Sequence, residues 1–304
     1  MKILVTGPNG FIGSHLLQVM SDAGDEVIAV VKDRQENIAS IKDLPGVRIV
    51  YCELSEIAAL PEKVADRDIA LCVHLAWAGS SGDGRADYAL QLENVRYALD
   101  VVKVLPQMGI RRFVGAGTLA EKDVMIYIPI DGATPNAVSI YGSAKIATHY
   151  MTKALCSSLG IEHIWCRLSN TYGIGNTTNN FVNMASRNML FGGSLKFTPG
   201  EQMYDFVYIT DTVRAIYAAA TKGKTNTCYY LGSTKPRKLK EYIYQIRDAV
   251  NPDLQLEVGA LPFNGLSLPE EEYSTKKLVE DTEYVPSVSF EEGIRKTVEW
   301  LKSL

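Results

Sequence analysis

The chain has 304 residues, a net charge of −4 and 46% hydrophobic residues, which suits a soluble globular protein and disfavours nucleic-acid or anionic-membrane partners. Its five cysteines are scattered without CxxC spacing, which argues against a disulfide framework and a zinc site, so we expect no metal. The opening "MKILVTG" is too short for a signal-peptide core and no apolar run approaches a membrane span, so we expect a soluble protein. The cysteine usage favours a reducing cytoplasm as its location.

Short apolar runs alternate with helix-length amphipathic stretches over the first half of the chain. The candidate strands, in chain order, are "KILVTG", "EVIAVV", "RIVYC", "IALCVHLA", "RRFVGAG" and "HIWCRLS". Alternating strands and helices predict an α/β fold with a doubly wound parallel sheet, covered on both faces and built with right-handed crossovers.

After Tyr172 this alternation loosens. A polar stretch, "GIGNTTNN", leads to a helix from about Phe181, and a later helix, "TDTVRAIYAAATKG", leads to a strand, "TCYYLGS", that returns to the sheet. The C-terminus predicts an ordered helix, with a capping box at Ser289 and Glu292. Its apolar face is formed by Phe290, Ile294, Val298 and Leu301.

A glycine-rich loop lies between the first predicted strand and the first predicted helix. In "TGPNGFIG" the glycines allow a tight turn and a close approach to a ligand, and the helix start presents free N–H groups to a pyrophosphate. The spacing is GxxGxxG, and the alternative is a purely structural turn. The candidate dinucleotide-binding residues of this loop are Gly7, Asn9, Gly10, Phe11, Ile12 and Gly13.

The end of the second predicted strand bears on which dinucleotide is bound. A carboxylate there would bind the ribose hydroxyls of NAD, whereas a cation would accept the extra phosphate of NADP. Val31 stands at the expected acidic position, and Lys32 and Arg34 follow it. We therefore favour NADP(H), with NAD(H) as the alternative because Asp33 lies between the two cations. The remaining interpretation is that all three are solvated turn charges.

Three polar residues predict a site for hydride transfer. Tyr141 and Lys145 are four residues apart on one face of a predicted helix, and an ammonium can stabilise the tyrosine phenolate. Thr118 ends the fifth predicted strand, where open α/β sheets bind their ligands, and can hydrogen-bond a substrate oxygen. We expect Gly115 and Gly117 to leave room for a nicotinamide.

Together these segments resemble the extended short-chain dehydrogenase/reductase family, in its nucleotide-sugar epimerase, dehydratase and reductase branch. The resemblance spans nearly the whole chain. The matching segments are "TGPNGFIG", "HLAWAG" from His74, "LENVRYAL" around Asn94, Thr118, "YGSAK", "RLSNTYGIG" from Arg167, "DFVYITD" from Asp205 and "EDTEYVPSVSFEEGI".

The resemblance implies a Rossmann sheet of about seven strands and a small C-terminal lobe that binds a nucleotide-sugar. It implies a catalytic triad of Thr118, Tyr141 and Lys145, with substrate contact from Asn170. Further residues expected at the cofactor are Leu75, Ala76, Gly79 and Asn94. On this basis residues 1–172 form the NAD(P)-binding domain, with its sheet completed by about 205–234. Residues 173–204 and 235–304 form the substrate-binding lobe. A homodimer is expected from the resemblance alone.

Two departures from the family pattern reduce the range of reactions and substrates that we expect. Sugar-nucleotide dehydratases of this family place Asp-Glu directly after the catalytic threonine, where this chain has Leu119 and Ala120, which disfavours water elimination. The family often has an arginine for the diphosphate before Asp205, where this chain has Tyr204. We therefore expect Arg187 or Lys196, with Tyr204 beside them, to contact the substrate, or the substrate to be held differently.

The favoured function is an NAD(P)-dependent reductase of a keto nucleotide-sugar, of the 4-keto-6-deoxy type. In this scheme Tyr141 is the general acid, Thr118 orients the carbonyl, and Lys145 tunes the tyrosine and holds the ribose. The alternatives are a 4-epimerase that retains NAD, a non-catalytic cofactor-binding sensor, and a reductase of a non-sugar ketone. His74, Cys72 and Cys166 are expected to be packing residues, and His149 to lie on the exposed or packed side of its helix and not in the site.

Overall fold

A seven-stranded parallel sheet forms the centre of the protein in a computed structural model, which describes residues 1–263, 265 and 267–304. The order across the sheet is β11-β6-β5-β4-β1-β2-β3, and every neighbouring pair is parallel. The strands are β1 (Lys2–Thr6), β2 (Glu26–Val31), β3 (Val47–Tyr51), β4 (Leu71–His74), β5 (Arg112–Thr118), β6 (Glu162–Leu168) and β11 (Thr227–Leu231). The predicted doubly wound fold and strand count are confirmed.

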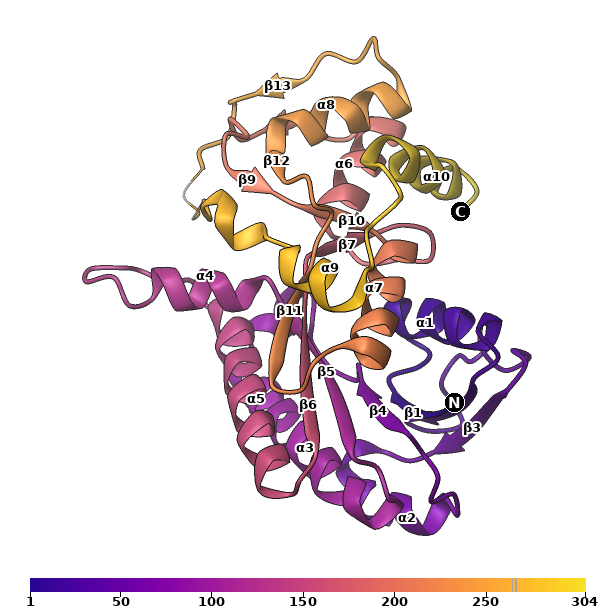
Figure 1. Cartoon of the computed structure of the whole chain (residues 1–304). Helices are drawn as coiled ribbons and strands as arrows, with labels where there is room; N and C mark the ends of the chain where they lie inside the picture. Colours follow the sequence, from indigo (N-terminus) through magenta and orange to yellow (C-terminus); the bar gives the residue numbers. More distant parts are fainter. Residues whose placement is uncertain (264, 266) are drawn as a thin grey trace.

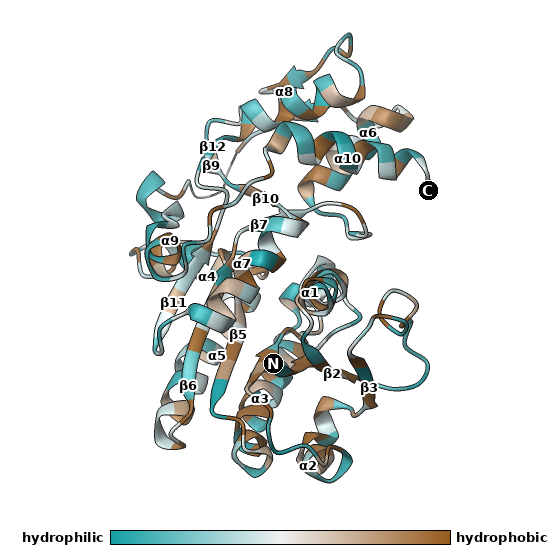
Figure 2. Cartoon of the chain, turned by 45° about the vertical axis from the view of Figure 1, so that its right-hand side comes forward, coloured by the Kyte–Doolittle hydropathy of each residue, from teal (hydrophilic) through white to brown (hydrophobic). Residues whose placement is uncertain are grey.

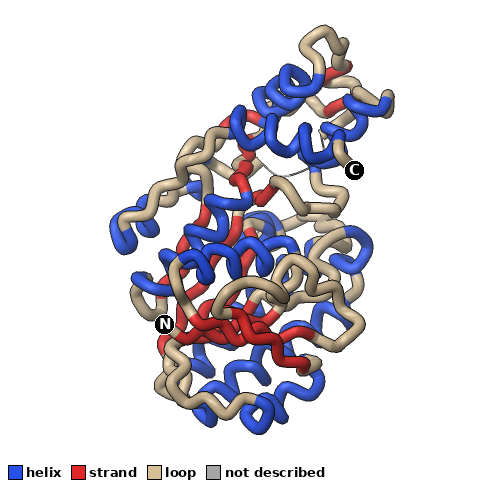
Figure 3. The backbone as a smooth tube through the Cα atoms, turned by 90° about the vertical axis from the view of Figure 1, so that its right-hand side faces the viewer, coloured by secondary structure: helices blue, strands red, loops and turns tan. Residues whose placement is uncertain are grey.

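Helices cover both faces of this sheet, as Figure 3 shows with the strands seen between two helical layers. Alternation along β1 sends Ile3 and Val5 to one face and Leu4 to the other, because successive strand side chains point to opposite sides. One face packs on α1 (Phe11–Asp22) and α7 (Ile209–Lys222), and the other on α3 (Tyr88–Val104) and α5 (Ser139–Ser158). Both sheet faces are therefore apolar, visible as brown strands in Figure 2.

The remaining elements form the edges of the sheet domain and a second lobe, seen at the top of Figure 1. Residues 173–204 and 235–258 and the C-terminal helix come together there. The other helices are α2 (Leu60–Lys63), α4 (Ala120–Tyr127), α6 (Phe181–Phe191), α8 (Leu239–Val250), α9 (Lys276–Thr282) and α10 (Phe290–Lys302), with 3₁₀ turns η1 (Leu54–Ala59), η2 (Gly82–Ala86), η3 (Leu105–Met108) and η4 (Glu270–Tyr273). The short strand pairs are β7 (Asn170–Tyr172) with β10 (Phe206–Tyr208), β9 (Met203–Tyr204) with β12 (Arg237–Lys238), and β8 (Lys196–Phe197) with β13 (Glu257–Val258).

The C-terminal helix α10 joins the lobe to the sheet domain through its apolar face. Phe290, Ile294, Val298 and Leu301 are all buried, as the helical periodicity predicts. The Phe290 ring lies 4.7 Å from Tyr242 of α8 and 5.0 Å from Tyr172 of β7, measured between ring centroids. The Ser289 hydroxyl accepts the Glu292 N–H at 3.1 Å, which confirms half of the capping box; the Glu292 carboxylate pairs with Lys296 instead.

The order of the strands fixes where a ligand can enter. The chain reverses its direction of winding between β1 and β4, so the loops after these strands diverge and leave a crevice at their carboxyl ends. Within the described residues, none of the helices is both long and apolar enough to cross a membrane.

Candidate active site

A large cleft lies at the carboxyl ends of the central strands, below the second lobe. Its volume is about 1140 Å³, more than the few hundred cubic ångströms that one small ligand fills, and enough for a dinucleotide with a second ligand beside it. Most of the residues predicted from the sequence line this one cleft. They are Gly7, Asn9, Gly10, Phe11, Ile12, Gly13, Lys32, Leu75, Ala76, Asn94, Thr118, Tyr141, Lys145, Asn170 and Tyr204.

The glycine loop is shaped for close approach of a ligand. Gly7 has φ +70°, and a Cβ there would lie 2.7 Å from the backbone nitrogen of Ala76. A Cβ on Gly13 would meet backbone atoms of Gly7 and Pro8. Gly7 is therefore required by packing on the segment after β4, and Gly13 by packing of α1 on the loop. No side-chain hydrogen bond caps the start of α1, and Gly10, Phe11 and Ile12 of its first turn line the cleft, which suits a pyrophosphate at a helix N-terminus. These residues fit a dinucleotide.

The two cations after β2 lie in different surroundings. Lys32 is exposed on the cleft wall, and the described residues offer its ammonium no ion-pair or hydrogen-bond partner. The Arg34 guanidinium lies 4.8 Å from the centroid of the Tyr51 ring and is not on the cleft wall. A carboxylate also lines this end of the cleft, because Glu36 accepts a hydrogen bond from Asn9 Nδ2 at 2.9 Å.

Tyr141 and Lys145 project from α5 into the cleft beside an aromatic wall. Lys145 Nζ donates to the Ala116 carbonyl at 2.9 Å and lies 3.6 Å from the Trp77 ring centroid, a cation–π contact. It is 5.9 Å from the Tyr141 ring centroid. The cation that lies over the tyrosine ring is Arg85, whose guanidinium carbon is 4.6 Å from the centroid.

Burial controls the protonation of this pair. It lowers the pKa of Lys145 to about 7, an effect that Glu121 partly opposes. It also raises the pKa of Tyr141, although Arg85 and Thr118 act in the opposite direction. The structure thus differs from the sequence expectation that Lys145 stabilises the phenolate, because the phenol is buried and the cation facing it is Arg85.

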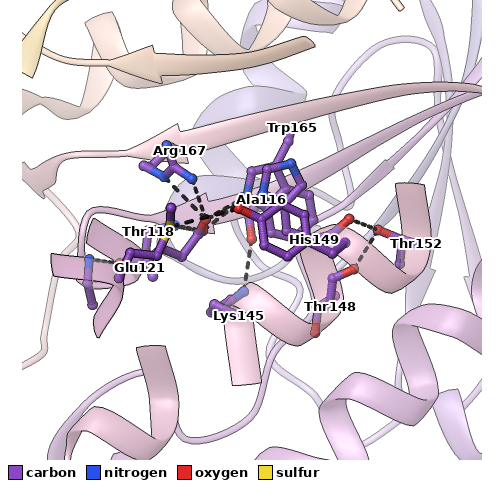
Figure 4. A network of polar contacts seen from close by, with 12 residues as sticks. Ala116, Thr118, Glu121, Lys145, Thr148, His149, Thr152, Trp165 and Arg167 are labelled. Carbon is purple, nitrogen blue, oxygen red and sulfur yellow. Dashed lines mark hydrogen bonds and ion pairs between the residues drawn. The ribbon is translucent and has the colours of Figure 1, made fainter. Parts of the chain in front are cut away.

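Thr118 lies at the end of β5 over a buried carboxylate, shown in Figure 4. Glu121 is fully buried and accepts the Thr118 N–H at 2.8 Å, the Trp165 indole N–H at 3.0 Å and the Arg167 guanidinium at 2.8 Å. Burial alone would raise the pKa of Glu121, but His149, Arg167 and the Thr118 N–H lower it to about 2. The Glu121 carboxylate therefore stabilises the end of β5 through these hydrogen bonds.

The glycines of β5 have a different role from the one expected. A Cβ on Gly115 would lie 2.4 Å from the Trp165 ring, and a Cβ on Gly117 would meet both that ring and Glu121. The space beside these glycines is filled by the indole of Trp165, on β6. The expectation that they make room for a nicotinamide is wrong: they make room for the network that supports Thr118.

The remaining predicted residues take the following places. Arg34, Gly79, Arg187 and Lys196 do not line the cleft. Arg187 Nη1 lies 3.4 Å from Asn179 Oδ1, at the cleft edge, and Lys196 is exposed on β8. Asn94 lines the cleft but uses its amide on the Ala78 backbone and on the Leu90 carbonyl, so it fixes the loop after β4.

The packing predictions are confirmed. His74 bonds the Thr6 hydroxyl at 2.8 Å, and burial lowers its pKa to about 3. His149 stacks on Trp165 with ring centroids 4.7 Å apart, and Cys72 and Cys166 are buried. No group of three or more potential metal ligands comes together in the described part of the chain.

Sequence reasoning missed the roles of Trp77, Arg85 and Glu121. Trp77 and Arg85 follow the β4 strand end, in the segment 75–86 that borders the crevice, and this position was an available signal. Glu121 carried no such signal, because its partners Trp165 and Arg167 are 44 and 46 residues away.

The chain is similar to known proteins in both sequence and structure. The sequence profile of the NAD dependent epimerase/dehydratase family matches residues 3–232. A dTDP-glucose 4,6-dehydratase of Escherichia coli is 26% identical over 343 residues, covering 99% of this chain and 93% of that protein. The crystal structure of the Bordetella bronchiseptica enzyme WbmF in complex with NADH has a TM-score of 0.82 at 21% identity, covering 99% and 92%. The UDP-glucose 4-epimerase of Thermotoga maritima with UDP-glucose has a TM-score of 0.78 at 22% identity, covering 100% and 99%.

Proposed function

This chain belongs to the NAD-dependent epimerase/dehydratase family, and from that premise we propose that it is an NAD(P)-dependent reductase of a keto nucleotide-sugar, of the 4-keto-6-deoxy type. One observation carries the proposal: Thr118, Tyr141 and Lys145 line the same cleft as the glycine loop, while the nearest buried carboxylate, Glu121, is held ionised by Arg167. The site has groups for proton transfer beside the loop that would hold a hydride donor. Among the described residues, the carboxylate next to Thr118 is engaged by Arg167 and is not free to help expel water.

The residues divide the work of the reduction as follows. A bound nicotinamide would supply the hydride to the carbonyl carbon. The Tyr141 hydroxyl donates its proton to the carbonyl oxygen as that oxygen gains charge, and the Thr118 hydroxyl hydrogen-bonds the same oxygen. The Thr118 oxygen already accepts the Ala120 N–H at 3.3 Å, which leaves its own O–H free to donate. Lys145 is placed to bind the ribose and to return a proton to Tyr141.

The acidic pair that the family pattern leads us to expect in a dehydratase is missing after the threonine. Leu119 and Ala120 occupy those positions here, and Ala120 begins helix α4. Since elimination of water needs an acid and a base aligned on the sugar, a shift of about 1 Å in such groups is already costly. This difference supports reduction rather than dehydration.

We favour NADP(H) as the cofactor, with NAD(H) as the alternative. The support is Lys32, an exposed ammonium on the cleft wall at the end of β2. Arg34 is turned onto Tyr51 and contributes less. Glu36 on the same wall is the feature that favours NAD(H).

The substrate-binding lobe of the proposal consists of residues 173–204 and 235–304, on the sheet domain of residues 1–172. Its support is that Asn176, Thr178 and Tyr204 line the cleft opposite Tyr141. We also propose a cytoplasmic homodimer. Exposed apolar side chains on the packed helices α3 and α5, Tyr88, Leu92, Tyr150 and Met151, support this, and light scattering of the purified protein tests it.

Turnover of a defined substrate panel tests the function. Purified protein is incubated with NADPH or NADH and with dTDP-4-keto-6-deoxyglucose, GDP-4-keto-6-deoxymannose, UDP-glucose or UDP-glucuronate. We expect consumption of NADPH with one keto substrate, and a loss of about 100-fold or more in Tyr141→Phe, which removes the proton donor. Interconversion of a UDP-sugar and its 4-epimer without consumption of added NADPH would establish the epimerase instead. Cofactor binding without any turnover would leave the sensor interpretation.

A further inference from the structure

Arg85 is a half-buried cation of the cleft that the proposed mechanism does not use. It lies on η2, the 3₁₀ turn after β4, and its guanidinium is stacked on Tyr141 with 4.6 Å from Cζ to the ring centroid. The side chain lines the cleft. It thus lies beside the residue that we assign to proton transfer.

The guanidinium has no protein partner among the described residues. No hydrogen bond or ion pair involves Arg85, and its Nε atom is buried without an acceptor. Arg34 and Arg214 also lack such partners, but both are exposed and water can satisfy them. Arg167 is buried and donates to Glu121. Arg85 is half-buried, and its Nε is shielded from water without an acceptor. Since a buried donor left unpaired is costly, we expect this guanidinium to have an acceptor in the working state.

The surroundings define what acceptor would fit. A guanidinium presents a planar fork of N–H donors that matches the two oxygens of a carboxylate or phosphate. Tyr204 is near enough to Arg85 for their charges to interact, and it stands where the family often has a diphosphate-binding arginine. Asp123 of α4 also faces this guanidinium, but no oxygen of it lies within ion-pair distance.

We propose that Arg85 binds an oxyanion of the substrate, either its diphosphate or a carboxylate on its sugar, and holds it beside Tyr141. This inference rests on the proposed function, since it takes the cleft to bind a nucleotide-sugar. The cation that contacts the diphosphate would then be Arg85, on the loop after β4, and not a residue at position 204 of β9, where this chain has Tyr204. It also makes Arg85 a positioning residue for Tyr141, because the guanidinium covers one face of the phenol.

The test compares Arg85→Gln and Arg85→Lys with a matched control, Arg247→Gln. Arg247 is on helix α8, outside the cleft, with its Cζ 5.1 Å from the centroid of the Tyr244 ring. It therefore has the same arginine–tyrosine contact at a position away from the candidate site. The protein is saturated with its cofactor, so that the probes cannot occupy the glycine loop. Calorimetry then measures binding of UDP, dTDP and D-glucuronate, and kinetics measure KM, kcat and their pH dependence.

For Arg85→Gln we expect at least a tenfold rise in KM, cofactor affinity within twofold of wild type, and partial recovery in Arg85→Lys, which keeps the charge but loses the fork. The alkaline limb of the rate profile should move to higher pH, because the guanidinium no longer opposes the raised pKa of Tyr141. The groups facing Tyr141 are Arg85, Lys145, Thr118 and Glu121, and Asp123 faces Arg85. Asp123→Asn should leave that limb in place.

The outcomes distinguish a diphosphate from a sugar carboxylate as the bound oxyanion, and they test the role of Arg85 separately from the proposed function. Loss of UDP and dTDP affinity in Arg85→Gln identifies the diphosphate, whereas loss of D-glucuronate affinity alone identifies a sugar carboxylate. Probe affinities, KM and pH profile all within twofold of wild type would overturn the inference, as would wild-type protein that binds none of the probes. If wild type turns over no nucleotide-sugar, the proposed function fails, yet a selective loss of oxyanion binding in Arg85→Gln still supports this role.

Discussion

The two ends of the cleft are built in different ways. The dinucleotide end, at the loop between β1 and α1, is shaped by backbone, and Gly7 and Gly13 are held there by contacts with other backbone atoms. The catalytic end, at the tip of β5, is shaped by side chains, since Thr118 is supported by Glu121, Trp165 and Arg167. The first packs backbone against backbone, at Gly13 within its own loop and at Gly7 on the segment after β4, whereas the second depends on side chains of β6.

This difference determines how each end responds to change. The glycine loop is disrupted when a side chain is added at Gly7 or Gly13, because the new Cβ would overlap backbone atoms. A side-chain network fails when one partner is removed, because the others are left buried with unmet charge. Substitutions can therefore weaken one end and spare the other.

The largest effect is expected at the catalytic end, from Glu121→Leu. The change leaves the Arg167 guanidinium buried without its carboxylate and should lower the free energy of unfolding by about 3–5 kcal/mol. It also removes the acceptor of the Thr118 N–H, so kcat should fall by about 10- to 100-fold in the protein that folds. Urea denaturation and steady-state kinetics measure the two effects.

Two further variants and the pH dependence sharpen this prediction. Glu121→Leu with Arg167→Met should recover most of the lost stability, whereas Glu292→Gln, which breaks a solvent-screened pair on α10, should leave the midpoint of urea denaturation almost unchanged. The pKa of Glu121 is lowered from 4.5 to about 2 in the folded chain. Its stabilisation is therefore complete above pH 4.5 and lost as the pH falls toward 2, so the stability gap between wild type and Glu121→Leu should shrink over that interval. A gap that is constant with pH would contradict the ion-pair account.

The same contrast explains what could be predicted from the sequence. The sheet, the glycine loop and the position of Tyr141 and Lys145 on one cleft wall were predictable, because apolar alternation, glycine spacing and the Tyr141–Lys145 interval are local patterns. The support beneath Thr118 was not, because Glu121 has the same charge whether it faces water or Arg167. Nor did the sequence distinguish Lys32, on the cleft wall, from Arg34, which lies over Tyr51.

At the dinucleotide end, Gly7→Ala should have the next largest effect. Its φ of +70° is strained for alanine, and the new Cβ would lie 2.7 Å from the Ala76 nitrogen, so the loop must move away from β4. We expect a loss of about 2–4 kcal/mol in unfolding free energy and a weakening of cofactor binding by more than tenfold. Gly24→Ala is the matched control, with φ +76° and no atom near its Cβ.

In Gly24→Ala the backbone strain of about 1 kcal/mol should appear alone, without any change in cofactor affinity. Thermal unfolding and fluorescence titration with NAD(H) and NADP(H) measure both variants. Equal losses in the two variants would mean that strain, and not the packing of the loop on Ala76, accounts for the effect. The glycine loop would then depend less on its packing against Ala76 than the contact distance indicates.

The smallest effect is expected from Lys32→Ala, which tests whether a single side chain at the backbone-built end selects the cofactor. The ammonium is exposed on the cleft wall, so its removal should not change stability by more than about 0.5 kcal/mol. Loss of one charge-assisted phosphate contact, about 1.5 kcal/mol, should weaken NADP(H) binding by about tenfold and leave NAD(H) within twofold. Arg34→Ala should change neither affinity by more than about twofold, because its guanidinium lies over Tyr51 off the wall. If Lys32→Ala weakens both cofactors equally, the lysine contacts a group that they share, and the choice between them must then be made by Glu36 at the same end of the cleft.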